Sequence, residues 1–184
     1  MDSSLQRLLE EITAATSDLN HEELTRRPEG KWSVAEVLEH LYLTYTGTQK
    51  AFDRCLKAGK PLGGAPTFKQ RVATMAVTKF GYFPEGRKSP DHALPKGISA
   101  EKVVAEIGPQ ITAMARIIAQ CEERYGSRVK VLDHPILGPL TARQWRKFHL
   151  AHGRHHVKQI VERKKSARQR DLNRKASGES RRLW

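Results

Sequence analysis

Residues 148–160 hold four of the eight histidines of this 184-residue chain and read Phe148-His149-Leu150-Ala151-His152-Gly153-Arg154-His155-His156-Val157-Lys158-Gln159-Ile160. Residues four apart lie on one face of an α-helix, about 5–6 Å from each other. His152 and His156 would therefore point to the same side, where two imidazoles can chelate one divalent metal ion. The stretch predicts a helix with a metal-binding face, and a further ligand has to come from elsewhere in the chain.

Amphipathic helices account for most of the remaining sequence. Apolar residues recur with a spacing of three and four over residues 5–19, 34–56 and 99–125, and Thr141 followed by Gln144 forms a capping box that opens the histidine-bearing helix. A shorter helix is expected over 67–80, inside the Gly- and Pro-rich connection 59–98. Val129–Val131 is too short to indicate a sheet. The pattern predicts an all-α fold, a four-helix bundle with one short extra helix in the 59–98 connection.

The net charge of +13 is unevenly distributed along the chain. Nine Lys and Arg residues and only two acidic residues lie in 163–184, which gives this segment a net charge of +7. We expect one bundle domain over 1–164 and a basic tail without regular structure over 165–184. The chain shows no signal peptide and no apolar run long enough to span a membrane, and its two cysteines match no disulfide framework, so a cytoplasmic location is expected.

His40 is the best candidate for the missing metal ligand. It lies between Val37 and Leu41 on the apolar side of the second long helix, so it faces inward. Taken alone, it could equally be a buried neutral histidine bonded to a neighbour. An inward histidine on one helix and the His152/His156 pair on another together support one metal site, because such sites in bundle cores are formed by side chains of facing helices.

Two blocks of the sequence resemble the DinB-like metal-binding proteins. Residues 32–41, Trp-Ser-Val-Ala-Glu-Val-Leu-Glu-His-Leu, are similar to the first signature of that family, and residues 134–160 to the second. The resemblance spans most of residues 5–162. It implies an up-down-down-up four-helix bundle and one divalent ion, often zinc or nickel, held by His40, His152 and His156. It also implies that the protein acts on a small molecule, either by metal-dependent hydrolysis or by transfer of a low-molecular-weight thiol.

The other candidate residues are expected to play lesser parts. His149 and Gln159 lie one turn from the paired histidines and could support the ligands or touch a substrate, although Gln159 could equally make an ordinary interhelical hydrogen bond. His155 points about 100° away from His156. His134 is expected to order its own loop, and His21 and His92 have no supporting context.

Several enzyme classes are excluded by missing motifs. The chain has no HExxH, no HxE…PCxxC, no Gly-rich phosphate loop and no GxSxG. Three imidazole ligands suit zinc, nickel, copper and iron alike, and they would leave open coordination positions on the bound ion. The leading hypothesis is a hydrolase or thiol transferase acting on a small molecule, with a homodimer as an option. The alternatives are a nucleic-acid or polyanion-binding protein using Arg163–Arg182 and a metal-binding bundle without catalysis.

Overall fold

The computed structural model describes residues 3–83 and 89–180, and most of them are helical. The predicted predominance of helix is therefore confirmed. The elements are, in chain order, α1 (Ser3–Thr16), α2 (His21–Thr25), α3 (Val34–Lys57), α4 (Phe68–Phe80), the 3₁₀ turn η1 (Asp91–Ala93), α5 (Ala100–Tyr125), β1 (Lys130–His134), β2 (Gly138–Thr141) and α6 (Ala142–Ser180).

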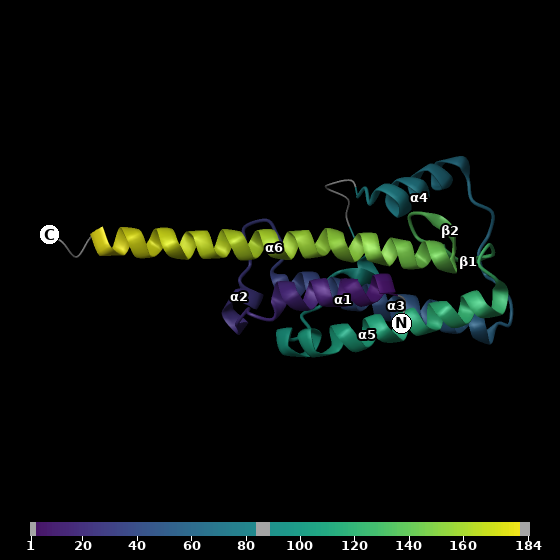
Figure 1. Ribbon diagram of the computed structural model, residues 1–184, viewed down its shortest axis with the longest axis horizontal. Coiled ribbons are helices and arrows are strands. Elements are labelled where there is room, and N and C mark those ends of the chain that lie inside the picture. Colours follow the sequence, from purple (N-terminus) through teal and green to yellow (C-terminus); the bar gives the residue numbers. More distant parts are fainter. Residues whose placement is uncertain (1–2, 84–88, 181–184) are drawn as a thin grey trace.

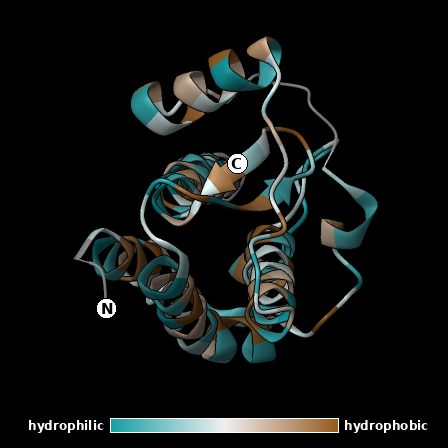
Figure 2. Cartoon of the chain, turned by 90° about the vertical axis from the view of Figure 1, so that its right-hand side faces the viewer, coloured by the Kyte–Doolittle hydropathy of each residue, from teal (hydrophilic) through white to brown (hydrophobic). Residues whose placement is uncertain are grey.

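Helix α6 runs the length of the molecule, with the other elements on two sides of it (Figure 1). α1, α3 and α5 lie along one side of its first half, and α4 lies on the opposite side, at the top of Figures 1 and 2. Both α1 and α5 pack against α6, while α3 and α5 pack against each other. This arrangement places α3 and α6, the two helices expected to carry metal ligands, in contact.

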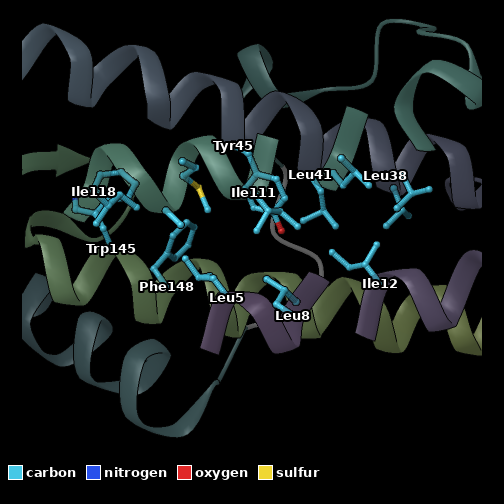
Figure 3. Packing of buried hydrophobic residues seen from close by; sticks show 14 of the residues in the cluster. Leu5, Leu8, Ile12, Leu38, Leu41, Tyr45, Ile111, Ile118, Trp145 and Phe148 are labelled. Atoms are coloured by element: carbon cyan, nitrogen blue, oxygen red, sulfur yellow. The ribbon is translucent and has the colours of Figure 1, made fainter. Parts of the chain in front are cut away.

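A single hydrophobic core holds these helices together. Figure 3 shows Leu5, Leu8 and Ile12 of α1 facing residues of α3 and α5, with Trp145 and Phe148 of α6 at one end. The apolar side chains at helical spacing in each segment are almost completely buried, among them Leu38 and Leu41 of α3, Ile111 and Ile118 of α5, and Ile160 of α6. Burial of such side chains from water is the main force that stabilises the fold.

Capping boxes begin both ligand-bearing helices, and the box of Thr141 and Gln144 was predicted from the sequence. Ser33 Oγ accepts from the backbone N–H of Glu36 at 3.1 Å, and the Glu36 carboxylate accepts from the backbone N–H of Ser33 at 2.7 Å. Thr141 and Gln144 make the same pair of hydrogen bonds at the start of α6, at 3.0 and 3.1 Å. Each box satisfies backbone donors that a helix start leaves free, which fixes the first turn of both ligand-bearing helices.

Helix α1 packs tightly against α6 at Gly153, between the two paired histidines. A Cβ atom at this position would lie 2.6 Å from Cδ2 of Leu8. Such a distance is far below van der Waals contact. Only glycine therefore allows α1 to pack this closely against the turn of α6 that carries the histidines.

Besides the turn η1, the structure contains two features that the sequence pattern did not predict. Strands β1 and β2 form an antiparallel hairpin in which Leu132 pairs with Leu140 and His134 with Gly138. The hairpin is stabilised from outside by a hydrogen bond from Leu62 N to Val131 O at 2.9 Å. The second element is the five-residue helix α2, capped by Asn20. Neither element is long enough to produce a periodic pattern.

The chain continues as a helix through Ser180, where the sequence led us to expect an irregular tail from residue 165. Ala167 is buried, and Arg168 pairs with Asp18 at 2.7 Å, so the first turns beyond Lys164 still contact the body. The remaining turns project past α2 (Figure 1). Lys, Arg, Gln and Ala are favourable helix residues, which explains why this segment extends α6. The separation into domains at residue 164 stays a prediction.

Candidate metal centre

Three imidazoles from two helices meet inside the protein. His40 Nε2 lies 3.2 Å from His152 Nε2, which lies 3.0 Å from His156 Nε2. One ring nitrogen from each of the three histidines lies within 4.8 Å of the other two, and all three residues are buried. The structure therefore brings together the three residues that the sequence singled out, from positions far apart in the chain.

The outer nitrogens of two of these imidazoles are held by oxygen atoms. His40 Nδ1 donates to the backbone carbonyl of Ala93 at 2.8 Å, and His156 Nδ1 donates to Oε1 of Gln159 at 2.9 Å. A neutral imidazole carries one proton. With that proton on Nδ1, His40 and His156 both direct the lone pair of Nε2 toward the centre of the cluster. Second-shell acceptors of this kind orient metal-binding histidines in proteins.

Burial keeps the three imidazoles neutral. It lowers the pKa of His156 to about 3, a shift to which the nearby His40 contributes. It also lowers the pKa of His40, against the opposing effect of the Ala93 hydrogen bond, and holds the pKa of His152 well below its usual value, with help from His156 and His40. Only the neutral form offers a lone pair to a metal ion, so the site is in its ligating form at neutral pH.

The geometry of the cluster fits a divalent ion. Two imidazole nitrogens bound at 2.0–2.1 Å to a tetrahedral zinc ion would be about 3.3 Å apart, close to the two short separations observed. Without an ion, a single proton on His152 Nε2 would have to be shared between two acceptors. His152 Nδ1, which is also buried, has no hydrogen-bond partner among the described residues. A cation among the three Nε2 atoms would use all three lone pairs at once.

Aromatic side chains surround the cluster. The Trp32 ring lies 5.3 Å from that of His40, and the Phe83 ring lies 5.7 Å from that of His152. Phe148 stacks on His152 with centroids 5.3 Å apart and the planes within 10° of each other. These rings give the three imidazoles largely apolar surroundings.

The remaining candidate residues fall outside the cluster. Both nitrogens of His149 are buried and have no hydrogen-bond partner within the described ranges, and burial lowers its pKa to about 3. Gln159 contacts His156 and also lies 3.0 Å from His155 Nε2. His134 orders its loop as expected, because its Nδ1 accepts from the backbone N–H groups of Ile136 and Leu137, both at 3.1 Å.

The two histidines without sequence context are not part of the cluster. His21 is exposed and pairs with Glu101 at 2.6 Å. His92 belongs to the η1 turn and is exposed. Neither offers a nitrogen to the cluster of three imidazoles.

Two parts of the site were not found from the sequence. The carbonyl of Ala93 is a backbone group, for which residue type gives no signal. Phe83 lies in an irregular connection, so its position over His152 depends on the path of the chain between α4 and η1. Trp32 lies in the first block of similarity, directly before the capped start of α3, so its position beside the site could have been predicted from the sequence.

Comparison with known proteins gives the family. Residues 2–163 match the model of a family described as a protein of unknown function, DUF1569. The chain belongs to the DUF1569 family. The match includes His40, His152 and His156 and ends at residue 163, so the projecting turns of α6 lie beyond it. The DUF1569 chain is also 30% identical over 147 residues to the uncharacterized protein YuaE of Bacillus subtilis (strain 168), covering 78% of this chain and 85% of that protein. No solved structure matches.

Among the described residues, no helix combines the length and the hydrophobicity that crossing a membrane requires.

Proposed function

We propose that this protein binds one divalent metal ion through the Nε2 atoms of His40, His152 and His156, and that it acts on a small molecule at this ion as a hydrolase or a low-molecular-weight-thiol transferase. The observation that carries the proposal is the convergence of three buried, neutral imidazoles from α3 and α6. Zinc and nickel both accept imidazole ligands, and three protein ligands leave positions free for water or substrate.

The proposed fold is a four-helix bundle of the DinB-like up-down-down-up type, formed by α1, α3, α5 and the first half of α6. Two observations support it: these four helices share one hydrophobic core, and the three histidines that the resemblance names as ligands lie close together. The short helix α4 lies in the connection 59–98, as the proposal requires.

A bound ion would lower the pKa of water or of a thiol and so supply the nucleophile. The protein's own groups perform the positioning. Ala93 O and Gln159 Oε1 hold two of the imidazoles, and Trp32 and Phe83 keep the surroundings apolar. No carboxylate in the described part of the chain makes a hydrogen bond to the three ligands, a pattern that favours chemistry activated by the ion over chemistry that needs a dedicated carboxylate base.

Metal analysis of protein purified without an affinity tag tests the proposal. We expect about one equivalent of metal in the wild type and its loss in His40→Ala, His152→Ala and His156→Ala. His21→Ala is the control, because His21 is exposed and offers no nitrogen to the cluster, and this variant should keep its metal. Unchanged metal in His40→Ala would contradict the three-histidine site.

Catalysis needs a test of its own. The metal-loaded protein should turn over ester substrates or transfer a thiol to an electrophile, and a chelator should abolish this activity. A protein that binds stoichiometric metal through the three histidines but turns over neither class would be a non-catalytic metal-binding bundle, which is the competing interpretation of the same site.

A second candidate function uses the projecting part of α6. Lys165 and Arg170 are exposed on a helix that extends past the body of the molecule (Figure 1), and a basic helix binds nucleic-acid phosphates through release of counterions. Deletion of residues 165–184 should abolish binding to duplex DNA while metal content is retained. Absence of DNA binding by the full chain at about 150 mM salt would rule this function out.

A further inference from the structure

A cavity lies away from the three clustered histidines, between α4, the β-hairpin and the first turn of α6. It has a volume of about 250 Å³ and is bordered by Arg71, Thr74 and Lys79 of α4, Lys130 of β1 and Gln144 of α6. Gln144 and His152 are eight residues apart on one helix, or about 12 Å along its axis. The cavity is therefore distinct from the candidate metal centre.

The charged groups around this cavity are all positive. Arg71, Lys79 and Lys130 border it, and no carboxylate is among the described residues that do so. Neither Arg71 nor Lys79 forms an ion pair with any residue in the described ranges. Lys130 Nζ donates to Gln144 Oε1 at 2.7 Å, so its one fixed partner is a neutral amide. Three cations thus face a common space without a compensating negative charge.

The surroundings of Lys130 disfavour the charged form of its side chain. The residue is half-buried, and burial lowers its pKa, as does the neighbouring positive charge of Arg71. Gln144 fixes the ammonium group because its Oε1 also accepts from the backbone N–H of Thr141, which ties the side chain to the capping box of α6. An anion in the cavity would offset the repulsion between Lys130 and Arg71.

We propose that this cavity binds a small phosphate monoester, with the phosphate between Arg71, Lys79 and Lys130. A phosphate monoester carries a charge of about −1.5 to −2 at neutral pH and three acceptor oxygens, which suits three cations better than a single carboxylate does. The guanidinium of Arg71 can bind two of these oxygens at once. Met75 and the prolines at positions 66 and 139 provide an apolar surface for the organic part of the ligand.

The size of the cavity limits the ligand. Sites for drug-sized molecules have volumes of about 300–1,000 Å³, so a cavity of about 250 Å³ takes a phosphate with a small organic group. The first turn of α6 contributes the positive end of a helix dipole close to Gln144, which favours an anion at the same place.

Isothermal titration calorimetry of the full-length, metal-loaded protein with inorganic phosphate and phenyl phosphate tests the proposal. Both should bind, phenyl phosphate more tightly, and benzoate should bind more weakly than either. Lys130→Gln and Arg71→Gln should each weaken phosphate binding by about ten-fold or more, since each removes a charge-assisted hydrogen bond. Arg71 is exposed, so that variant should fold even if Lys130→Gln does not.

Two controls separate this cavity from other sources of phosphate binding. Lys69→Gln removes the same charge from an exposed position on α4 that does not border the cavity, and should change the affinity by less than about two-fold. His152→Ala should leave binding unchanged. The proposal is overturned if neither phosphate binds saturably, if Lys69→Gln and Lys130→Gln lose the same affinity, or if His152→Ala abolishes binding because the phosphate occupies the metal site.

Discussion

His40 and His152 are 112 residues apart in the chain, yet their Nε2 atoms lie 3.2 Å from each other at the contact between α3 and α6. The outer nitrogen of His40 is bonded to Ala93 O, so the backbone between α4 and α5 also holds this imidazole in place. The geometry of the candidate metal centre therefore depends on three separate parts of the chain, and variants in each of them should have measurable effects.

Gln159 is expected to control metal affinity without being a ligand. Gln159→Leu removes the oxygen that accepts from His156 Nδ1 at 2.9 Å, so His156 loses its fixed orientation. We expect the affinity for zinc to fall by roughly 10- to 100-fold, as measured by competition with a chromophoric chelator. Gln159→Glu keeps an oxygen at the same position and should largely retain the affinity. Equal affinities for Gln159→Leu and wild type would show that the hydrogen bond does not support the ligand.

His134 should make the free energy of unfolding sensitive to acid. Burial lowers its pKa to about 4 in the folded protein, against the usual value of 6.5. Its contribution to stability is complete above pH 6.5 and is lost as the pH falls from there toward 4, because the unfolded chain binds the proton more readily. Protonation also removes the lone pair that accepts from Ile136 and Leu137. The loss should reach about 2 kcal/mol at pH 5.

Denaturant unfolding of the chelator-treated protein at pH 7.5 and 5.0 measures this effect. His134→Asn keeps an acceptor in the turn but does not titrate, so the difference in unfolding free energy between the two pH values should shrink by about 2 kcal/mol relative to wild type. An identical pH dependence in wild type and His134→Asn would contradict the assignment.

Two glycines provide a matched pair for the helix packing. Gly153→Ala forces a Cβ atom against Leu8 and should lower the free energy of unfolding by about 1–3 kcal/mol. Gly47→Ala, within α3, meets no atom within 4 Å and should raise it by about 0.5–1 kcal/mol. Thermal or urea denaturation distinguishes the two. If both substitutions stabilise the protein, α1 and α6 do not approach as closely as described.

Glu39 should hold the segment that follows η1. Its buried carboxylate accepts from the backbone N–H groups of Lys96 and Gly97 at 2.6 and 3.2 Å. Glu39→Ala leaves both donors unpaired, so we expect a loss of roughly 2–4 kcal/mol in the free energy of unfolding and faster hydrogen exchange at these two amides. Glu123→Ala, at an exposed position on α5, should cost less than about 0.5 kcal/mol. Unchanged exchange at Lys96 and Gly97 would rule out the restraint.

The sequence predicted those features of the molecule that depend on local pattern. The long helices follow from apolar spacing, and the starts of α3 and α6 follow from the Ser33–Glu36 and Thr141–Gln144 boxes. The approach of His40 to the α6 histidines was predicted because each lies on an inward face. The helices and their starts are determined by residues within one or two turns of each other, whereas the pairing of His40 with the α6 histidines could be expected because both faces are inward.

Features that depend on distant contacts could not be predicted in this way. The two strands of the β-hairpin contain only nine residues in total. The hairpin is also stabilised by a backbone hydrogen bond from Leu62, which lies in a different part of the chain. The hydrogen bond from His40 to the Ala93 carbonyl depends on the path of an irregular connection. The cavity beside Lys130 is bordered by residues of α4, the β-hairpin and α6. Each contributes a Lys, Arg or Gln side chain of a kind that is common on protein surfaces, so the sequence gives no signal that they meet.

Gly153 also affects which way the histidines of α6 point. Each residue of an α-helix turns about 100° around the axis, so a change of one residue in the contact with α1 would rotate both imidazoles by that angle, away from His40. The missing side chain at Gly153 lets Leu8 fit at one position along α6. The rotational phase of the ligand-bearing helix is thus set by a residue that cannot itself bind a metal.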